Sequence, residues 1–291
     1  HVILVHNPGQ AIGTGTNFSV EHVQSQIDVM NEDFRRLNSD SSNTPSEFAA
    51  GDSEIEFCLA SVDPNGNPTD GITRYSTTQN MNSNEFSIKS ATGWNRNDYL
   101  NIWSAPNLGG ILGWAYLPST TNLPNATLDG VVCAAGSFGG PGFATNNPYD
   151  LGRTVTHEIG HYLGLLHIWR NNGCNSDDGF ADTPLQDDEY FGCPTHPQQS
   201  CGSNDMFMNY MDYVNDNCMN AFSVQQGDYM QTILNTSRSS LLNAASTLCN
   251  NVVALTIELI TSTDVTCFGE ATGSLEVAAG GGVPPYSYSI N

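Results

Sequence analysis

The stretch HEIGHYLGLLH occupies residues 157–167, and the interpretation of the whole chain starts from it. In a helix, His157 and His161 lie one turn apart on the same face, so both imidazoles can reach one metal ion. Glu158 lies on the neighbouring edge of that face, where its carboxylate can sit beside a metal-bound water. This arrangement predicts a metal centre with a general base next to it.

The residues around this pair add a third ligand. A helix is expected from Leu151 to Leu163, and it stops at Gly164, which suits the left-handed exit conformation. The turn lets His167 supply a third nitrogen, and three protein ligands leave one position open for water, as in catalytic rather than structural zinc. Zinc acidifies that water and polarises a carbonyl. Glu158 then takes the water's proton and delivers it to the leaving amine.

A chance match on an amphipathic helix is the alternative to this interpretation. An isolated HExxH pattern is only moderately specific. Gly164 and His167 add two further matches at fixed offsets, and no cysteine lies in the motif to suggest a thiolate-bound structural site.

Composition excludes several classes of partner. The chain has 291 residues, enough for one large domain or one and a half smaller ones. Eight basic residues against 30 acidic ones give a formal charge of −22, which repels phosphate backbones and anionic lipid headgroups. No run approaches the ~18 apolar residues of a membrane span. We therefore expect neither nucleic acid nor a membrane as a partner.

The first residues and the cysteines indicate export. Residues 1–6 are strand-like and show no signal peptide, so we expect an export signal or pro-segment to have been removed. Eight cysteines, an even number, favour disulfides in an oxidising compartment over reduced, buried thiols. Spacing alone allows three pairings among the cysteines at positions 174, 193, 201 and 218. Two further candidate pairs are Cys58 with Cys133 and Cys249 with Cys267.

Hydrophobic periodicity predicts an α/β layer in the N-terminal half. Ser19 is expected to cap a helix that runs to about Leu37 with one buried stripe. Strands are expected at residues 1–6, 55–60, 99–103 and 130–133.

The C-terminal half changes character twice. Residues 165–222 are rich in Asp, Asn, Gly, Pro and Cys and lack periodicity, so they need covalent or ionic staples. Ser223 is expected to cap a last helix that ends near Ala245. We predict a domain at 1–248 and a truncated β-rich module at 249–291, with a C-terminal extension packed on the first domain as the alternative.

The pattern HExxHxxGxxH, followed downstream by a methionine, resembles the metzincin clan of metalloproteases. Within that clan the chain is similar to the pappalysin or cytophagalysin family. The matching stretches, spread from residue 1 to about 245, are IDVMNEDF (27–34), GITR (71–74), YLNIW (99–103), GRTVT (152–156), ADTP (181–184), FGCP (191–194) and NYMDY (209–213).

The resemblance implies a fold and two further site residues. The fold would be an α/β (α+β) metzincin catalytic domain: a twisted mixed sheet and two long helices above the cleft, and an irregular subdomain with a C-terminal helix below it. Met211 would form an apolar floor under the metal, and Tyr213 would support the oxyanion of the tetrahedral intermediate. From the residues alone, Met211 is ordinary core and Tyr213 a buried tyrosine with a satisfied hydroxyl.

The family pattern also suggests the disulfides Cys174–Cys201 and Cys193–Cys218. The chain departs from that pattern at one position. Arg170 stands where many relatives place a glycine. We expect it to narrow the cleft or to pair with the acidic loop that follows.

That acidic loop, residues 177–189, concentrates hard oxygen ligands. Like charges in a stapled loop repel unless a cation neutralises them, and calcium suits irregular oxygen ligands. The resemblance implies calcium beside the zinc, and Asp178, Thr183 and Asp187 are the best candidates for its ligands. A solvated acidic loop is the alternative.

Residues 264–288 are similar to the SprB-type repeats of Bacteroidetes surface and secreted proteins. This resemblance implies a bacterial chain that is secreted or attached to the cell surface.

Together these features predict a secreted zinc endopeptidase, monomeric, that acts on protein or peptide substrates. We expect the substrate to pair with an edge strand at about 135–140. Asp212 and Asp216 are expected to favour a basic residue after the scissile bond. The alternatives are an adhesion or binding protein with a vestigial metal site, and a zinc hydrolase of small amides.

Overall fold

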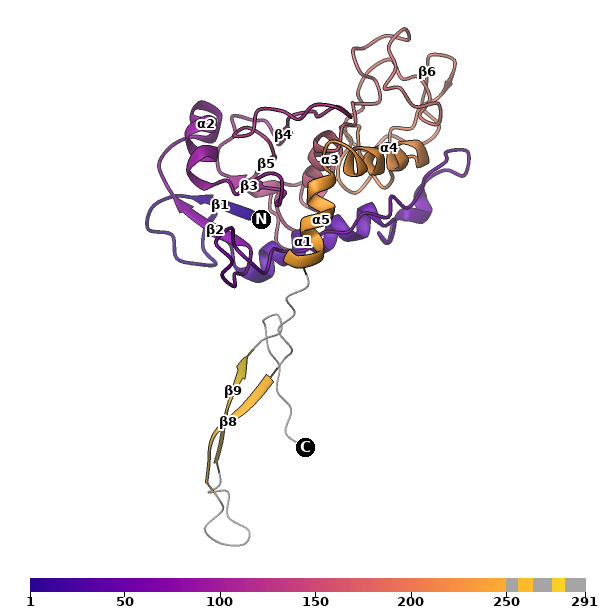
Figure 1. Ribbon diagram of the computed structural model, residues 1–291. Coiled ribbons are helices and arrows are strands. Elements are labelled where there is room, and N and C mark those ends of the chain that lie inside the picture. The colour runs from indigo at the N-terminus through magenta and orange to yellow at the C-terminus, as the bar shows by residue number, and fades with distance from the viewer. Residues whose placement is uncertain (250–255, 264–273, 281–291) are drawn as a thin grey trace, which may run out of the picture.

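The sheet is built around the first strand of the chain (Figure 1). β1 (Val2–His6) pairs in parallel with β2 (Ile72–Ser76) and with β3 (Ile102–Ala105), and β3 pairs in parallel with β5 (Val131–Ala134). β4 (Gly113–Ala115) runs antiparallel to β5, which gives the order β2-β1-β3-β5-β4. The sheet is therefore mixed, and β4 lies at one edge. The computed structural model describes residues 1–249, 256–263 and 274–280.

Helices cover both faces of this sheet. Alternate residues of a strand point to opposite faces. One set of β1 side chains joins the larger core cluster with α1 (Val20–Phe34) and α3 (Arg153–Tyr162). The other set packs with α2 (Met81–Thr92), whose Met81 and Ile88 are buried. Because both faces are covered, β1 is an unbroken apolar run rather than an alternating one.

Ser19 marks the start of α1, and two glycines mark the ends of α3. Ser19 caps α1 by accepting a hydrogen bond from a backbone amide of its first turn. The helix ends before the predicted limit, Leu37, whose side chain is 72% exposed. α3 follows Gly152 and stops before Gly164, both in the left-handed region at φ 84° and 93°. Gly164 thus provides the helix exit that the sequence predicts.

Residues 55–60 do not form the predicted strand. Asn31 of α1 supplies their hydrogen bonds instead, since the Phe57 amide donates to Asn31 Oδ1 at 2.7 Å and the Phe57 carbonyl accepts from Asn31 Nδ2 at 3.0 Å. A helix side chain takes the place of a partner strand, and alternation along the sequence cannot reveal such a contact.

Two helical regions differ from the prediction. α2 is missing from it because two of its four buried residues, Lys89 and Thr92, are polar, so the sequence shows no apolar stripe there. The single last helix is in fact two, α4 (Val224–Asn235) and α5 (Ser239–Leu248). Between them, the buried guanidinium of Arg238 donates to the Asp129 carboxylate at 2.8 and 3.0 Å. The helix is therefore interrupted at the position of Arg238, whose side chain forms this buried pair.

The disulfides correct one predicted pair. Among the described residues three disulfides form: Cys174–Cys201, Cys193–Cys218 and Cys58–Cys249. The first two are the pairs that the family pattern suggests, and they staple residues 165–222. The predicted Cys58–Cys133 pair is wrong, because Cys133 is a free, buried thiol on β5. Cys249 bonds to Cys58, and its predicted partner Cys267 lies outside the described residues.

The remaining elements are short or lie in the tail: η1 (Ser41–Asn43), η2 (Ala135–Ser137), β6 (Gln199–Ser200), β7 (Ser203–Asn204), β8 (Thr256–Thr263) and β9 (Ser274–Gly280). β8 and β9 pair with each other in antiparallel fashion. Across the described segments, no helix combines the length and the apolar character needed to cross a bilayer.

Candidate active site

The three predicted histidines converge on one point. His157 and His161 extend from α3, and His167 follows on the loop after Gly164. Nε2 of His167 lies 3.0 Å from Nε2 of His161 and 3.3 Å from Nε2 of His157. Three ligand nitrogens about 2.0–2.1 Å from a tetrahedral zinc ion lie roughly 3.3 Å from one another. The spacing of these imidazoles therefore fits a single metal ion.

Hydrogen bonds fix which nitrogen of each α3 histidine faces the centre. Nδ1 of His157 lies 2.7 Å from the carbonyl oxygen of Tyr210, and Nδ1 of His161 lies 2.8 Å from that of Leu165. A carbonyl only accepts, so Nδ1 carries the proton and Nε2 keeps its lone pair. Burial lowers the pKa of both rings, and it lowers the pKa of His167 to about 3. Neutral imidazoles with inward lone pairs are the form that binds metal.

Glu158 lies beside this centre in a confined position. Its side chain is buried, and burial raises its pKa to about 8. The Oε2 atom has no protein partner. Gly113 of β4 packs directly against this side chain, since a Cβ atom there would lie 2.8 Å from Cγ and 2.9 Å from Oε1 of Glu158. The sequence alone gave no signal for this contact.

Tyr213 and Trp169 flank the third ligand. The phenol oxygen of Tyr213 lies 3.1 Å from Nε2 of His167, and burial raises the pKa of this phenol to about 12. Trp169 stacks on the His167 ring at a centroid distance of 4.4 Å. The Tyr213 hydroxyl therefore stays protonated and can donate a hydrogen bond next to the metal site.

Met211 lies beneath the helix that carries the ligands. Its side chain is fully buried, and its backbone amide donates to Asn209 Oδ1 at 2.9 Å. A Cβ atom on Gly160 of α3 would overlap the Met211 sulfur. The glycine inside HEIGH thus lets the methionine approach the metal-binding turn. A glycine in the middle of a helix is itself a sequence signal for such a close approach.

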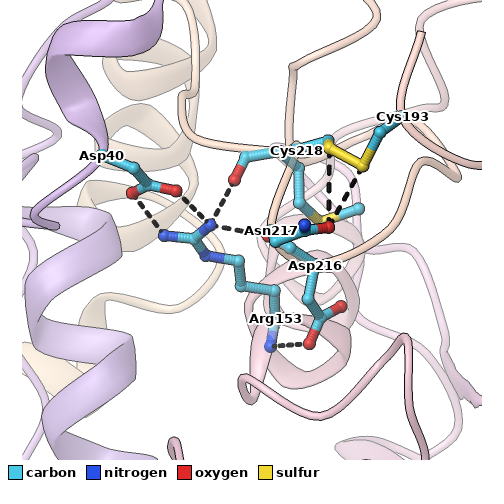
Figure 2. Close-up of a disulfide and its surroundings, with 7 residues drawn as sticks. Asp40, Arg153, Cys193, Asp216, Asn217 and Cys218 are labelled. Atoms are coloured by element: carbon cyan, nitrogen blue, oxygen red, sulfur yellow. Dashed lines mark hydrogen bonds and ion pairs between the residues drawn. A yellow bond between two sulfur atoms is a disulfide. The ribbon is translucent and has the colours of Figure 1, made fainter.

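A pocket of about 350 Å³ opens beside Glu158, and two of its lining residues, Arg153 and Asp216, are drawn in Figure 2. Its lining includes both predicted acidic residues, Asp212 and Asp216. Asp212 uses both carboxylate oxygens, accepting from the amides of Tyr190 and Tyr213 and from the side chain of Gln186. Asp216 Oδ2 accepts from the amide of Leu151 at 2.8 Å, but its buried Oδ1 has no partner. Asp216 is therefore the carboxylate with an oxygen left to bind a ligand.

The edge strand of the cleft is not the predicted segment. Residues 135–137 form the 3-10 helix η2, and β4 is the outer strand next to Glu158. The prediction missed β4 because this strand has only three residues, Gly113, Trp114 and Ala115.

Two of the three predicted calcium ligands contact each other. Asp178 Oδ1 accepts from the Thr183 hydroxyl at 2.7 Å, while the buried Asp178 Oδ2 has no partner. Burial raises the pKa of Asp178 to about 7. The carboxylate of Asp187 instead lies near the Cys174–Cys201 disulfide. The structure thus brings Asp178 and Thr183 together and places Asp187 beside the disulfide.

Arg170 pairs with the acidic loop rather than with the cleft. Its guanidinium donates to the carbonyl of Asp177 at 2.9 Å, and the residue is not part of the pocket lining. Its φ of 52° lies in the left-handed region, which favours glycine.

The sequence matches known families. The peptidase family described as pregnancy-associated plasma protein-A matches residues 82–235, and the SprB repeat matches residues 259–291. An extracellular metalloprotease of Arthroderma otae is 35% identical over 216 residues, which are 72% of this chain and 69% of that protein. Another, from Arthroderma benhamiae, is 42% identical over 151 residues, 50% of this chain and 54% of that protein.

The fold matches solved structures. Mature mirolysin of Tannerella forsythia, solved with a cleaved peptide, superposes with a TM-score of 0.78 at 41% identity and covers 86% of this chain and 96% of its own. A promirolysin mutant of the same species gives 0.77, also at 41% identity, over 86% of this chain and 84% of its own. The peptidase family covers more than half of the 291 residues here. The chain is therefore a metalloendopeptidase that belongs to the pregnancy-associated plasma protein-A, or pappalysin, family.

Proposed function

We propose that this protein is a secreted zinc endopeptidase in which His157, His161 and His167 hold the zinc and Glu158 is the general base. The observation that carries the proposal is the convergence of three Nε2 lone pairs beside a buried carboxylate with a free oxygen. Zinc bound there supplies a Lewis acid for the scissile carbonyl and acidifies a water molecule.

The protein residues perform the remaining work. Glu158 accepts the water's proton at Oε2 and passes it to the leaving amine. Tyr213 donates from its phenol to the oxyanion, which forms beside His167. The substrate backbone pairs with the outer side of β4, where no described strand is bonded, and this pairing aligns the scissile bond with Glu158.

The pocket beside Glu158 receives the side chain after the scissile bond. Asp216 presents a buried oxygen without a partner there, and an arginine or lysine side chain of the substrate would satisfy it. Both carboxylate oxygens of Asp212 already accept hydrogen bonds from the protein, so Asp212 shapes the wall of the pocket instead. We therefore assign the preference for a basic residue to Asp216.

Calcium is proposed at the acidic loop, with Asp178 and Thr183 as ligands. The unpartnered, buried oxygen of Asp178 beside the Thr183 hydroxyl supports this site. Asp187, which lies beside the Cys174–Cys201 disulfide, is the third proposed ligand.

Export and domain organisation rest on several features. The disulfides, the extracellular metalloproteases among the relatives and the SprB repeat match support a protein secreted or held at the cell surface of a bacterium. The boundary between residues 248 and 249 remains a prediction, as does a monomeric state.

Casein hydrolysis tests the proposal. The wild type should digest casein, lose activity with a zinc chelator and regain it when zinc returns. Glu158→Ala should bind zinc with unchanged stoichiometry but be inert. Glu32→Ala, which removes an exposed carboxylate from α1, should be fully active.

Two outcomes favour the alternatives. If the zinc-loaded wild type is as inert toward casein and peptides as Glu158→Ala, the protein is a binding module with a vestigial site. If it cleaves dipeptides and spares casein, it is a hydrolase of small amides.

A further inference from the structure

The pocket that holds Asp216 also holds a cation of the protein itself. Arg153, the first residue of α3, lines the same pocket, and its backbone amide donates to Asp216 Oδ2 at 3.3 Å. An unneutralised guanidinium there would compete with a basic substrate side chain for the Asp216 carboxylate. The protein has to keep the two charges apart.

The guanidinium of Arg153 pairs with the carboxylate of Asp40 and not with that of Asp216 (Figure 2). The two carboxylate oxygens of Asp40 accept from Nη1 and Nη2 of Arg153 at 2.6 and 2.7 Å, in a bidentate pair. Nη1 also donates to the backbone carbonyls of Asp216 and Met219 at 2.7 and 2.5 Å. The other carboxylate near the guanidinium is Asp33, at 3.5 Å from Nε. No ion pair joins the side chains of Arg153 and Asp216, both of which the structure describes.

The segment that carries Asp40 is anchored to Asn220, the residue after Met219 of the pocket lining. Asn38 donates to Asp40 Oδ1 at 2.7 Å and to the carbonyl of Asn220 at 3.1 Å. Thr44 donates to Asn220 Oδ1 at 2.7 Å. The Asp40 carboxylate is thus held in place by the residues that follow Asp216 and Met219 in the chain.

We propose that Asp40 is a positioning residue for substrate specificity: by holding Arg153, it leaves the Asp216 carboxylate free for a basic side chain after the scissile bond. This inference rests on the proposed function. Asp40 itself lies outside the pocket lining and acts only through Arg153.

Two peptides that differ only in Arg or Leu after the scissile bond test this role. The measured quantity is the ratio of their kcat/KM values. Asp40→Asn should lower the Arg/Leu ratio by about tenfold, mainly through KM of the Arg peptide, because the released charge of Arg153 then neutralises Asp216. Asp216→Asn should lower the ratio further, and Asp40→Glu should restore most of it. Asp52→Asn, which breaks an exposed Asp–Arg pair with Arg35, should leave the ratio unchanged.

A double variant separates charge from structure. In an Arg153→Met background, Asp40→Asn should no longer change the ratio, with thermal unfolding measured to confirm that each variant folds. An unchanged ratio in folded Asp40→Asn, or an equal loss with both peptides, overturns the role of Asp40. A wild type without preference for Arg overturns the basic specificity itself. In that case, the preference of wild type and Asp40→Asn for other residues at the same substrate position is compared. A changed order of preference supports the role of Asp40, and an unchanged order refutes it.

Discussion

Gly113 of β4 and Glu158 of α3 touch so closely that no side chain fits between them. A Cβ atom at position 113 would lie within 2.9 Å of two Glu158 atoms and 2.7 Å from the carbonyl oxygen of Val132. The strand proposed to bind the substrate therefore also limits where the general base can lie. In the proposed mechanism, one backbone segment sets both the position of the substrate and that of the proton acceptor.

Replacing Gly113 with alanine should lower kcat by up to about 100-fold, because the methyl group displaces the Glu158 carboxylate. Zinc stoichiometry should be unchanged. Gly227→Ala on α4 is the matched control, since its Cβ would meet neighbours at 3.4 Å, ordinary contact distance. Wild-type kcat in the Gly113 variant would show that Glu158 is not confined by β4.

Gly160→Ala should destabilise the protein although alanine is the better helix former. Overlap with the Met211 sulfur costs about 1–3 kcal/mol as overpacking. Alanine in a helix returns at most about 1 kcal/mol. Denaturant unfolding of the metal-loaded protein measures the difference, and a more stable variant would contradict close packing of Met211 under α3.

The Arg238–Asp129 pair should matter more than the exposed Arg35–Asp52 pair. Both side chains of the first pair are almost completely buried, and the guanidinium also lies 3.4 Å from the centre of the Tyr162 ring. Asp129→Asn leaves a buried charge without its partner and should cost about 3–5 kcal/mol. Asp52→Asn should change stability far less. Comparable losses in the two variants would refute this ranking.

Calcium should reverse the effect of pH on stability. Without metal, burial raises the Asp178 pKa to about 7 from an ordinary value of 3.8, so the folded state binds more protons than the unfolded state between these values. The contribution of Asp178 to stability therefore falls as pH rises from about 4 to 7. Calcium binds the ionised carboxylate, so in its presence stability should rise over this range.

Thermal unfolding of the calcium-free and calcium-loaded protein across pH 5–8 checks this prediction. Asp178→Asn should show a weaker decline without calcium and no gain with it. Equal curves with and without calcium would rule out a calcium site at Asp178.

Local patterns in the sequence predicted the parts of the site that are local. His157, His161 and the Gly164 exit follow from the geometry of a single helix and its end. The Met211 and Tyr213 assignments and the two disulfides of the irregular region required the family resemblance, because spacing left several pairings open.

Contacts between distant segments escaped the prediction. Asn31 replaces a partner strand for Phe57, and Arg238 interrupts the last helix to reach a carboxylate 109 residues earlier. The Asp40–Arg153 pair spans 113 residues, and neither residue belongs to the metal-binding motif. Such pairings depend on the folded arrangement, which periodicity along one segment does not encode.

The Cys58–Cys249 disulfide closes a loop across a sequence separation of 191 residues and lies directly after α5. Tension applied to the chain beyond Cys249 therefore passes through this covalent bond to Cys58. The helices α3, α4 and α5 and the strand β4 lie inside the loop and bear little of that load. A pulling force on the C-terminal side would therefore enter the fold at Cys58, and the segment that carries β1 and α1, which lies outside the loop, would bear it.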